Sequence, residues 1–136
     1  MLKMTTTERI FASLRRSQST AFVRKDFERF GEYRQVSRAI KKLVKEGILI
    51  RVGYGTYVKT RPSSISGKPV PAEPLLNIAF EIMAKLGVKA DAGADTEALR
   101  EGRSTQVPMS PIVNIGKARI RRKISYGNKT VVYEKG

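Results

Sequence analysis

The chain has 136 residues, 40% of them apolar, which is enough for one ordinary domain or for a small module with an appendage. It contains no cysteine and no histidine, which excludes disulfides, thiolate metal sites and the commonest general base. Its 27 Lys and Arg residues against 12 acidic residues give a net charge of +15, which suits a polyanionic partner or a merely soluble basic surface.

The positive charge is divided unevenly along the chain. Residues 1–60 carry 14 basic and 5 acidic residues, residues 61–116 are neutral, and residues 117–136 carry 7 basic residues and 1 acidic residue. A solubilising surface would not be expected to leave the middle neutral, so this map favours a nucleic acid as the partner. No apolar run has transmembrane length and the N-terminus lacks a signal-peptide core, so we expect a cytoplasmic protein without membrane contact.

The first predicted element is a helix over about residues 6–15. Thr5 and Glu8 have the spacing of a capping box, in which hydroxyl and carboxylate satisfy each other's backbone N–H groups. Apolar residues then recur at helical spacing. A polar break follows, and residues 21–23 form a short β-prone run.

Two further helices are predicted before a hairpin. The first covers residues 25–30 and buries Phe27 and Phe30. The second covers residues 33–46 and is amphipathic, with one apolar and one basic face. Both end at a glycine, which is typical of a helix C-terminus.

A β-hairpin is predicted next, with strands at 48–52 and 56–59 and a reversal at the glycines of 53–55. A winged helix-turn-helix has these elements in the same order: a short helix, a turn, a basic amphipathic helix and a hairpin. We therefore predict a winged helix-turn-helix DNA-binding domain over residues 1–60.

The remainder of the chain predicts a second, smaller domain. Residues 61–74 hold four of the six prolines and read as an irregular linker. Residues 75–136 are expected to form a small domain of helix plus antiparallel strands, so the fold class is α+β. Its predicted elements are helices at 75–86 and 94–100 and strands at 112–115, 118–124 and 130–133.

The helix at 33–46 is the first candidate for contact with DNA. A major groove admits one α-helix, and Arg and Gln side chains can each make two hydrogen bonds to a base. The alternative is an ordinary solvated helix face, which the preceding helix and the following hairpin make less favourable. The candidate contact residues are Tyr33, Arg34, Gln35, Ser37, Arg38, Lys41 and Lys42.

The hairpin is the second candidate. Arg51, Tyr54 and Lys59 flank its two glycines, and a wing of this type rests on the DNA backbone or in the minor groove. In the alternative interpretation the glycines serve only the turn.

The third candidate is the basic stretch at 117–123. In a strand its alternation would place four cations on one face. There Arg119 and Arg121 could hold phosphates, or the charges could equally protect an exposed sheet edge.

Catalysis has little support in the sequence, so we predict no enzyme, no metal and no cofactor. A carboxylate-only magnesium site is conceivable, but a solvated loop and helix start is the better interpretation of the acidic cluster. That cluster contains Asp91, Asp95, Glu97 and Glu101.

Residues 22–27 and 36–57 resemble the N-terminal domain of AbiEi-type antitoxins and related prokaryotic winged-helix regulators. Later stretches, at 67–71, 92–94 and 104–108, are similar to the second domain of such proteins. The resemblance implies binding to inverted repeats of double-stranded DNA and repression of the protein's own promoter. For some members it also implies neutralisation of a nucleotidyltransferase-type toxin encoded beside them.

Together these patterns predict a sequence-specific double-stranded DNA-binding protein that acts as a transcriptional repressor. Two alternatives come from other classes of protein. One is a protein-interaction module, an antitoxin or adaptor that binds a partner protein, and the other is a basic RNA-associated protein.

Overall fold

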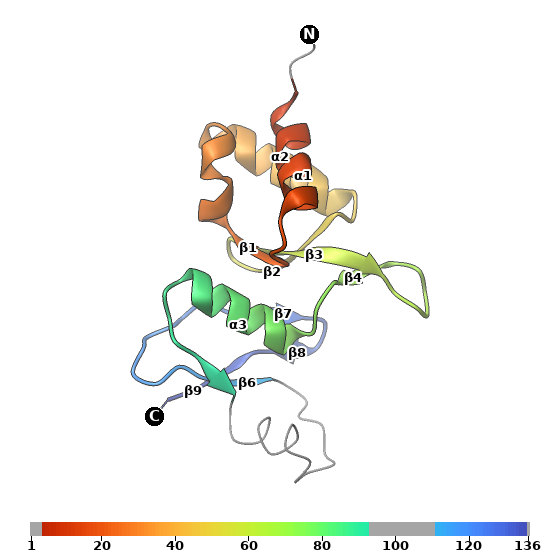
Figure 1. Cartoon of the computed structure of the whole chain (residues 1–136). Helices are drawn as coiled ribbons and strands as arrows, with labels where there is room; N and C mark the ends of the chain where they lie inside the picture. The colour runs from red at the N-terminus through yellow and green to blue at the C-terminus, as the bar shows by residue number, and fades with distance from the viewer. Residues whose placement is uncertain (1–3, 93–110, 136) are drawn as a thin grey trace. The chain divides into compact units, whose positions relative to one another are not determined.

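The computed structural model describes residues 4–92 and 111–135 and has a mixed α and β architecture, as predicted (Figure 1). The chain divides into two compact units. The first comprises Met1–Arg51 and Gly55–Ala72, and the second comprises Val52–Tyr54 and Glu73–Gly136. The turn of the hairpin is therefore grouped with the C-terminal part of the chain.

The first unit contains every element predicted before residue 60, with ends shifted by one or a few residues. The predicted helix at 25–30 is a 3₁₀-helix, the tighter form in which short helices often occur. The elements are α1 (Thr6–Arg16), β1 (Ala21–Val23), the 3₁₀-helix (Arg24–Phe30), α2 (Tyr33–Lys45), β2 (Leu49–Gly53), β3 (Thr56–Pro62) and β4 (Pro69–Pro71).

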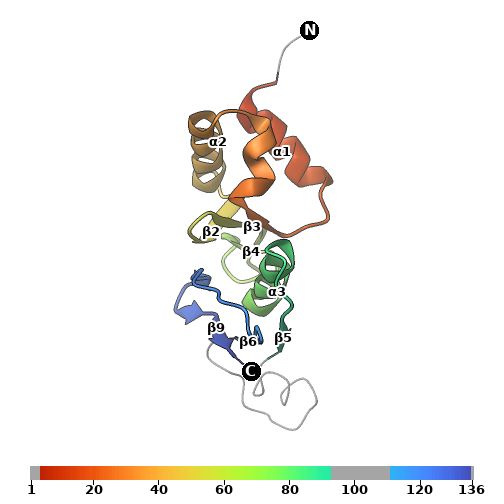
Figure 2. The ribbon, with the colours of Figure 1, turned by 90° about the vertical axis from the view of Figure 1, so that its left-hand side faces the viewer.

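The sheet of this unit has β3 between β1 and β2. β1 runs antiparallel to β3, with Phe22 opposite Tyr57. Helices α1 and α2 lie on the same side of this sheet in both views (Figures 1 and 2). The unit is thus two layers, with helices on one face of a small sheet.

Local interactions fix where the helices begin and end. The Thr5 hydroxyl accepts a hydrogen bond from the Glu8 N–H at 3.1 Å, as predicted for the start of α1. After α2, Gly47 has a φ of +77°, a conformation that side chains with a Cβ rarely adopt. The chain can therefore leave α2 directly and enter β2.

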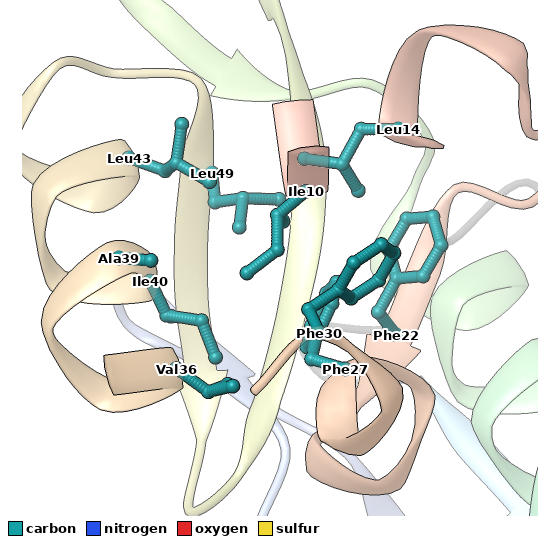
Figure 3. Close-up of a cluster of buried hydrophobic side chains, with 10 residues drawn as sticks. All are labelled: Ile10, Leu14, Phe22, Phe27, Phe30, Val36, Ala39, Ile40, Leu43 and Leu49. Atoms are coloured by element: carbon teal, nitrogen blue, oxygen red, sulfur yellow. The ribbon is translucent and has the colours of Figure 1, made fainter. Parts of the chain in front are cut away.

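One hydrophobic core joins the helices to the sheet (Figure 3). The apolar face of α2 points toward α1 and the phenylalanines of β1 and the 3₁₀-helix. Phe22 and Phe27 pack with ring centroids 5.7 Å apart. The core consists of Ile10, Leu14, Phe22, Phe27, Phe30, Val36, Ala39, Ile40, Leu43 and Leu49.

Residues 61–74 are not the irregular linker that their prolines suggested. β3 continues to Pro62, and β4 pairs with it antiparallel, with Arg61 opposite Val70. Proline cannot donate to a ladder but is tolerated on an edge strand, where its nitrogen needs no partner. Composition therefore indicated a loop where an edge hairpin forms.

The second unit packs one helix against a short sheet of order β5-β6-β9. A separate hairpin is formed by β7 and β8. Its elements are α3 (Leu75–Lys85), β5 (Asp91–Ala92), β6 (Ile112–Asn114), β7 (Ser125–Tyr126), β8 (Lys129–Thr130) and β9 (Val132–Glu134). Its buried apolar side chains include Ile78, Ala79, Ile82, Met83, Val113, Ile115, Ile124 and Val131.

Two strand predictions for this unit were wrong. Residues 118–124 pair into no ladder among the described residues; instead, the Arg122 side chain donates to the Tyr54 carbonyl, and the Ile124 carbonyl accepts from the Val131 N–H. β6 and β9 are parallel, which the long connection between them permits. The predicted helix at 94–100 and the stretch at 104–108 lie outside the described residues.

The burial of Leu43 gives the first testable prediction. Its side chain is 1% exposed within the core, so Leu43→Ala should leave a cavity and lower the free energy of unfolding by about 2–5 kcal/mol. Lys41→Ala, on the exposed side of the same helix, is the control and should have little effect. Urea unfolding of both variants measures the difference. Equal stability of the two variants would show that the register of α2 is wrong.

Candidate nucleic-acid interface

Helix α2 carries a row of exposed cations opposite its buried face. Arg34, Arg38, Lys41 and Lys45 are spaced by four, three and four residues, which places them along one side of the helix. We call these four residues the basic row. It extends over about 16 Å at 1.5 Å per residue. Within the described parts of the chain, no acidic side chain pairs with any of the four.

The basic row opposes the stability of its own helix. Like charges three or four residues apart on a helix destabilise it by about 0.2–0.5 kcal/mol per pair. Arg34 also lies in the first turn, where the helix dipole favours a negative charge. Burial of a Val, Leu or Ile side chain contributes about 1.5–3 kcal/mol, so the buried Val36, Ile40 and Leu43 of α2 outweigh these costs. The helix can therefore hold a concentration of charge that a polyanion would neutralise.

The predicted contact residues on α2 are mostly exposed. Arg34, Arg38, Lys41 and Lys42 reach solvent, and Tyr33 is 70% exposed at the first position of the helix. Gln35 is exposed too, but its Oε1 atom accepts a hydrogen bond from the Glu32 N–H at 3.2 Å. That bond caps the helix.

Ser37 is half-buried, and its hydroxyl is engaged by a residue that the sequence analysis did not select. One Nη atom of Arg24 donates to the Ser37 hydroxyl and to the Tyr33 carbonyl, each at 2.8 Å. The Arg24 guanidinium also lies 4.2 Å from the centroid of the Tyr33 ring. Arg24 thereby fastens the 3₁₀-helix to the first turn of α2. No local pattern relates positions thirteen residues apart, so only the folded chain reveals this role.

The three hairpin residues divide into two groups. Arg51 is exposed on β2, and Tyr54 is 80% exposed at the turn. Lys59 instead turns toward the protein, where its Nζ atom donates to the Ser17 carbonyl at 2.6 Å and lies 5.8 Å from the Phe22 ring. Lys59 therefore holds β3 to the end of α1.

Exposure alternates along the stretch at 117–123 as predicted, although it forms no ladder with the described residues. Lys117, Arg119, Arg121 and Lys123 are exposed, whereas Arg122 is half-buried. Tyr133 donates a hydrogen bond from its hydroxyl to the Arg122 carbonyl at 2.6 Å. Burial raises the pKa of Tyr133, and the charge of Arg122 partly offsets that rise.

Other kinds of site find little support in the described residues. No group of three or more metal-ligating side chains comes together there. Asp91 lies in β5, and the other three residues of the predicted acidic cluster fall outside the described ranges. Across those same ranges, no helix combines the length and the apolar character needed to cross a bilayer.

Comparison with known protein families gives a match over most of the chain. The model of a family of unknown function, DUF6088, matches residues 9–136. No curated protein matches the chain.

The contacts of Arg24 lead to a prediction about α2. Arg24→Met keeps the length of the side chain but removes two hydrogen bonds and the stacking on Tyr33. We expect it to lower the free energy of unfolding by about 1–2 kcal/mol and to speed amide exchange in the first turn of α2. The control is Arg34→Met, which removes an exposed cation of α2. If both variants unfold and exchange alike, Arg24 does not organise this turn.

The raised pKa of Tyr133 leads to a prediction about pH. The folded protein holds the phenol proton at a pH where an ordinary tyrosine, with a pKa of 10.0, loses it. The contribution of Tyr133 to the free energy of unfolding is therefore fully present below pH 10.0. It is lost as the pH rises from there through the pKa of Tyr133 in the folded protein. Tyr133→Phe should remove the part of the stability loss at high pH that Tyr133 causes, and Tyr126→Phe should leave that part unchanged. Denaturant unfolding across this range measures it, and identical pH dependence of the two variants would contradict it.

Proposed function

The chain belongs to the DUF6088 family, whose function is unknown, and we propose that it is a sequence-specific double-stranded DNA-binding protein. The observation that carries the proposal is the basic row of α2. It lies on the face opposite the buried residues and has no acidic partner within the described ranges. Affinity for DNA depends on neutralising phosphates with Lys and Arg, and an α-helix fits the major groove.

In this proposal the first unit is a winged helix-turn-helix. The 3₁₀-helix is the first helix of the motif, α2 is the recognition helix, and the β2–β3 hairpin is the wing. Residues 31 and 32 alone separate the two helices, and a short turn that contains a glycine, here Gly31, is typical of the motif. The exposed Tyr54 at the hairpin turn supports a wing that reaches the DNA backbone.

The contacts of the described side chains support the following proposed roles within this motif. Arg38 lies within the basic row and is the proposed base reader, since Arg bonds guanine through two hydrogen bonds. Lys41 and Lys42 are proposed phosphate contacts. Gln35 could bond adenine in two places only by giving up its bond to Glu32, so we assign it to the cap. Lys59 is left out of the interface because it is held by Ser17.

We further propose that binding represses transcription at inverted repeats, as the resemblance to AbiEi-type regulators implies. Neutralisation of a nucleotidyltransferase-type toxin belongs to the same proposal. It is tested separately, by co-expression with such an enzyme encoded beside this protein. Rescue of growth by variants that no longer bind DNA would assign the two activities to different surfaces.

The role of Arg38 provides the test of DNA binding. A site is first selected from random duplex DNA with the full chain. Arg38→Ala should then weaken binding to that site by about 1–3 kcal/mol, which is about 5- to 150-fold, and relax preference at one base step. Arg16→Ala removes the same charge from the end of α1 and should change affinity little.

Two outcomes would change the proposal. If Arg38→Ala lost the same affinity for every DNA sequence, Arg38 would be a phosphate contact. Selection of no duplex sequence by the wild-type chain would refute sequence-specific DNA binding, and capture of RNA or of a partner protein by the same surface would then favour the other classes.

A further inference from the structure

Residues 117–123, which we call the basic segment, begin at the end of a turn and lie outside the sheets formed by the described residues. Their outward side chains are Lys117, Arg119, Arg121 and Lys123, all exposed. Each of these four cations is separated from the next by one less exposed residue of the segment. None of them pairs with an acidic group in the part of the chain that the structure describes.

Two hydrogen bonds hold Arg122, the half-buried member of the segment, in place. Its Nη1 atom donates to the carbonyl of Tyr54 at 2.8 Å. Its own carbonyl accepts from the Tyr133 hydroxyl at 2.6 Å. Both contacts lie within the second unit, which includes the hairpin turn. The charged side chain of Arg122 therefore attaches the segment, and the four exposed cations of the segment are available to a partner.

A close approach of two backbones strengthens this attachment. The carbonyl oxygen of Lys123 lies so near Gly53 that a Cβ at position 53 would overlap it. The next residue, Ile124, is fully buried and accepts a hydrogen bond from the Val131 N–H at 2.9 Å. Three successive residues are thus fixed, two of them against the hairpin turn.

We propose that the basic segment is a second phosphate-binding surface, attached to the hairpin turn so that turn and segment contact one DNA duplex together. This inference rests on the proposed function, because it assumes that the duplex is the ligand. A segment fixed at its inward side loses little conformational freedom when its outward cations bind, which favours binding. The 80% exposed ring of Tyr54 adjoins the carbonyl to which the segment is attached, so the two surfaces are contiguous.

The test uses the full chain and measures affinity for the selected duplex at several salt concentrations. Each phosphate contact contributes about 0.9 to the slope of log K against log salt. The double variant Arg119→Gln/Arg121→Gln should therefore reduce that slope by up to about 2 and leave the ranking of DNA sequences intact. The control is Lys68→Gln/Lys89→Gln, which removes the same charge from exposed positions elsewhere and should leave the slope unchanged.

The attachment is tested without removing charge. Gly53→Ala should displace the segment from the turn and reduce the salt slope although all cations remain. Tyr133→Phe is a milder variant that removes the hydrogen bond to the Arg122 carbonyl, and far-ultraviolet circular dichroism verifies that both variants fold. An unchanged slope in the folded variants would overturn the attachment.

The outcomes separate this inference from the proposed function. If the wild-type chain binds no duplex, both the proposed function and this inference are refuted. A wild-type chain that binds its site, with equal slopes for the double variant and its control, keeps the function and overturns the inference. Normal DNA binding combined with aggregation of the double variant, seen by light scattering, would also overturn it and would assign the charges to the protection of an exposed edge.

Discussion

The arrangement of the first unit depends on the burial of one face of α2. Val36, Ala39, Ile40 and Leu43 are each at most 3% exposed, and together they fix the rotation of the helix about its own axis. Because that rotation is fixed, the residues between them can point only outward. The position of the basic row is thus a consequence of hydrophobic packing, which is far stronger than the repulsion among its charges.

The same packing determines which polar residues are available at the surface. Phe27 and Phe30 draw the 3₁₀-helix into the core, and this brings Arg24 to the first turn of α2. There Arg24 orders Tyr33 and occupies the hydroxyl of Ser37. A surface that is ordered in the free protein loses less conformational entropy on binding, so these contacts are consistent with the role proposed for α2.

The hairpin turn is subject to a different constraint. Its neighbours in β2 and β3 belong to the first unit, while the turn itself groups with the second. Gly53 allows the carbonyl of Lys123 to approach its backbone, and Arg122 donates to the carbonyl of Tyr54. The turn is therefore both the end of a hairpin and the attachment point of the basic segment.

The sequence by itself determined the elements up to residue 60, the division of charge and the two faces of α2. Each of these follows from local periodicity or from capping and turn residues, such as Thr5 and Gly47, that act over a few positions. It also predicted the alternating exposure of residues 117–123, although the strand from which that alternation was predicted does not form among the described residues.

Tertiary structure decided whatever depends on partners distant in the chain. The prolines of residues 61–74 indicate a loop until β3 provides the edge on which β4 pairs. Lys59 and Ser37 look like surface residues until Ser17 and Arg24 are brought to them. The basic segment reads as a strand, yet it is attached by Arg122 and Lys123 to a turn some seventy residues earlier. No local pattern encodes such contacts, since they arise only when the whole chain buries its apolar surface.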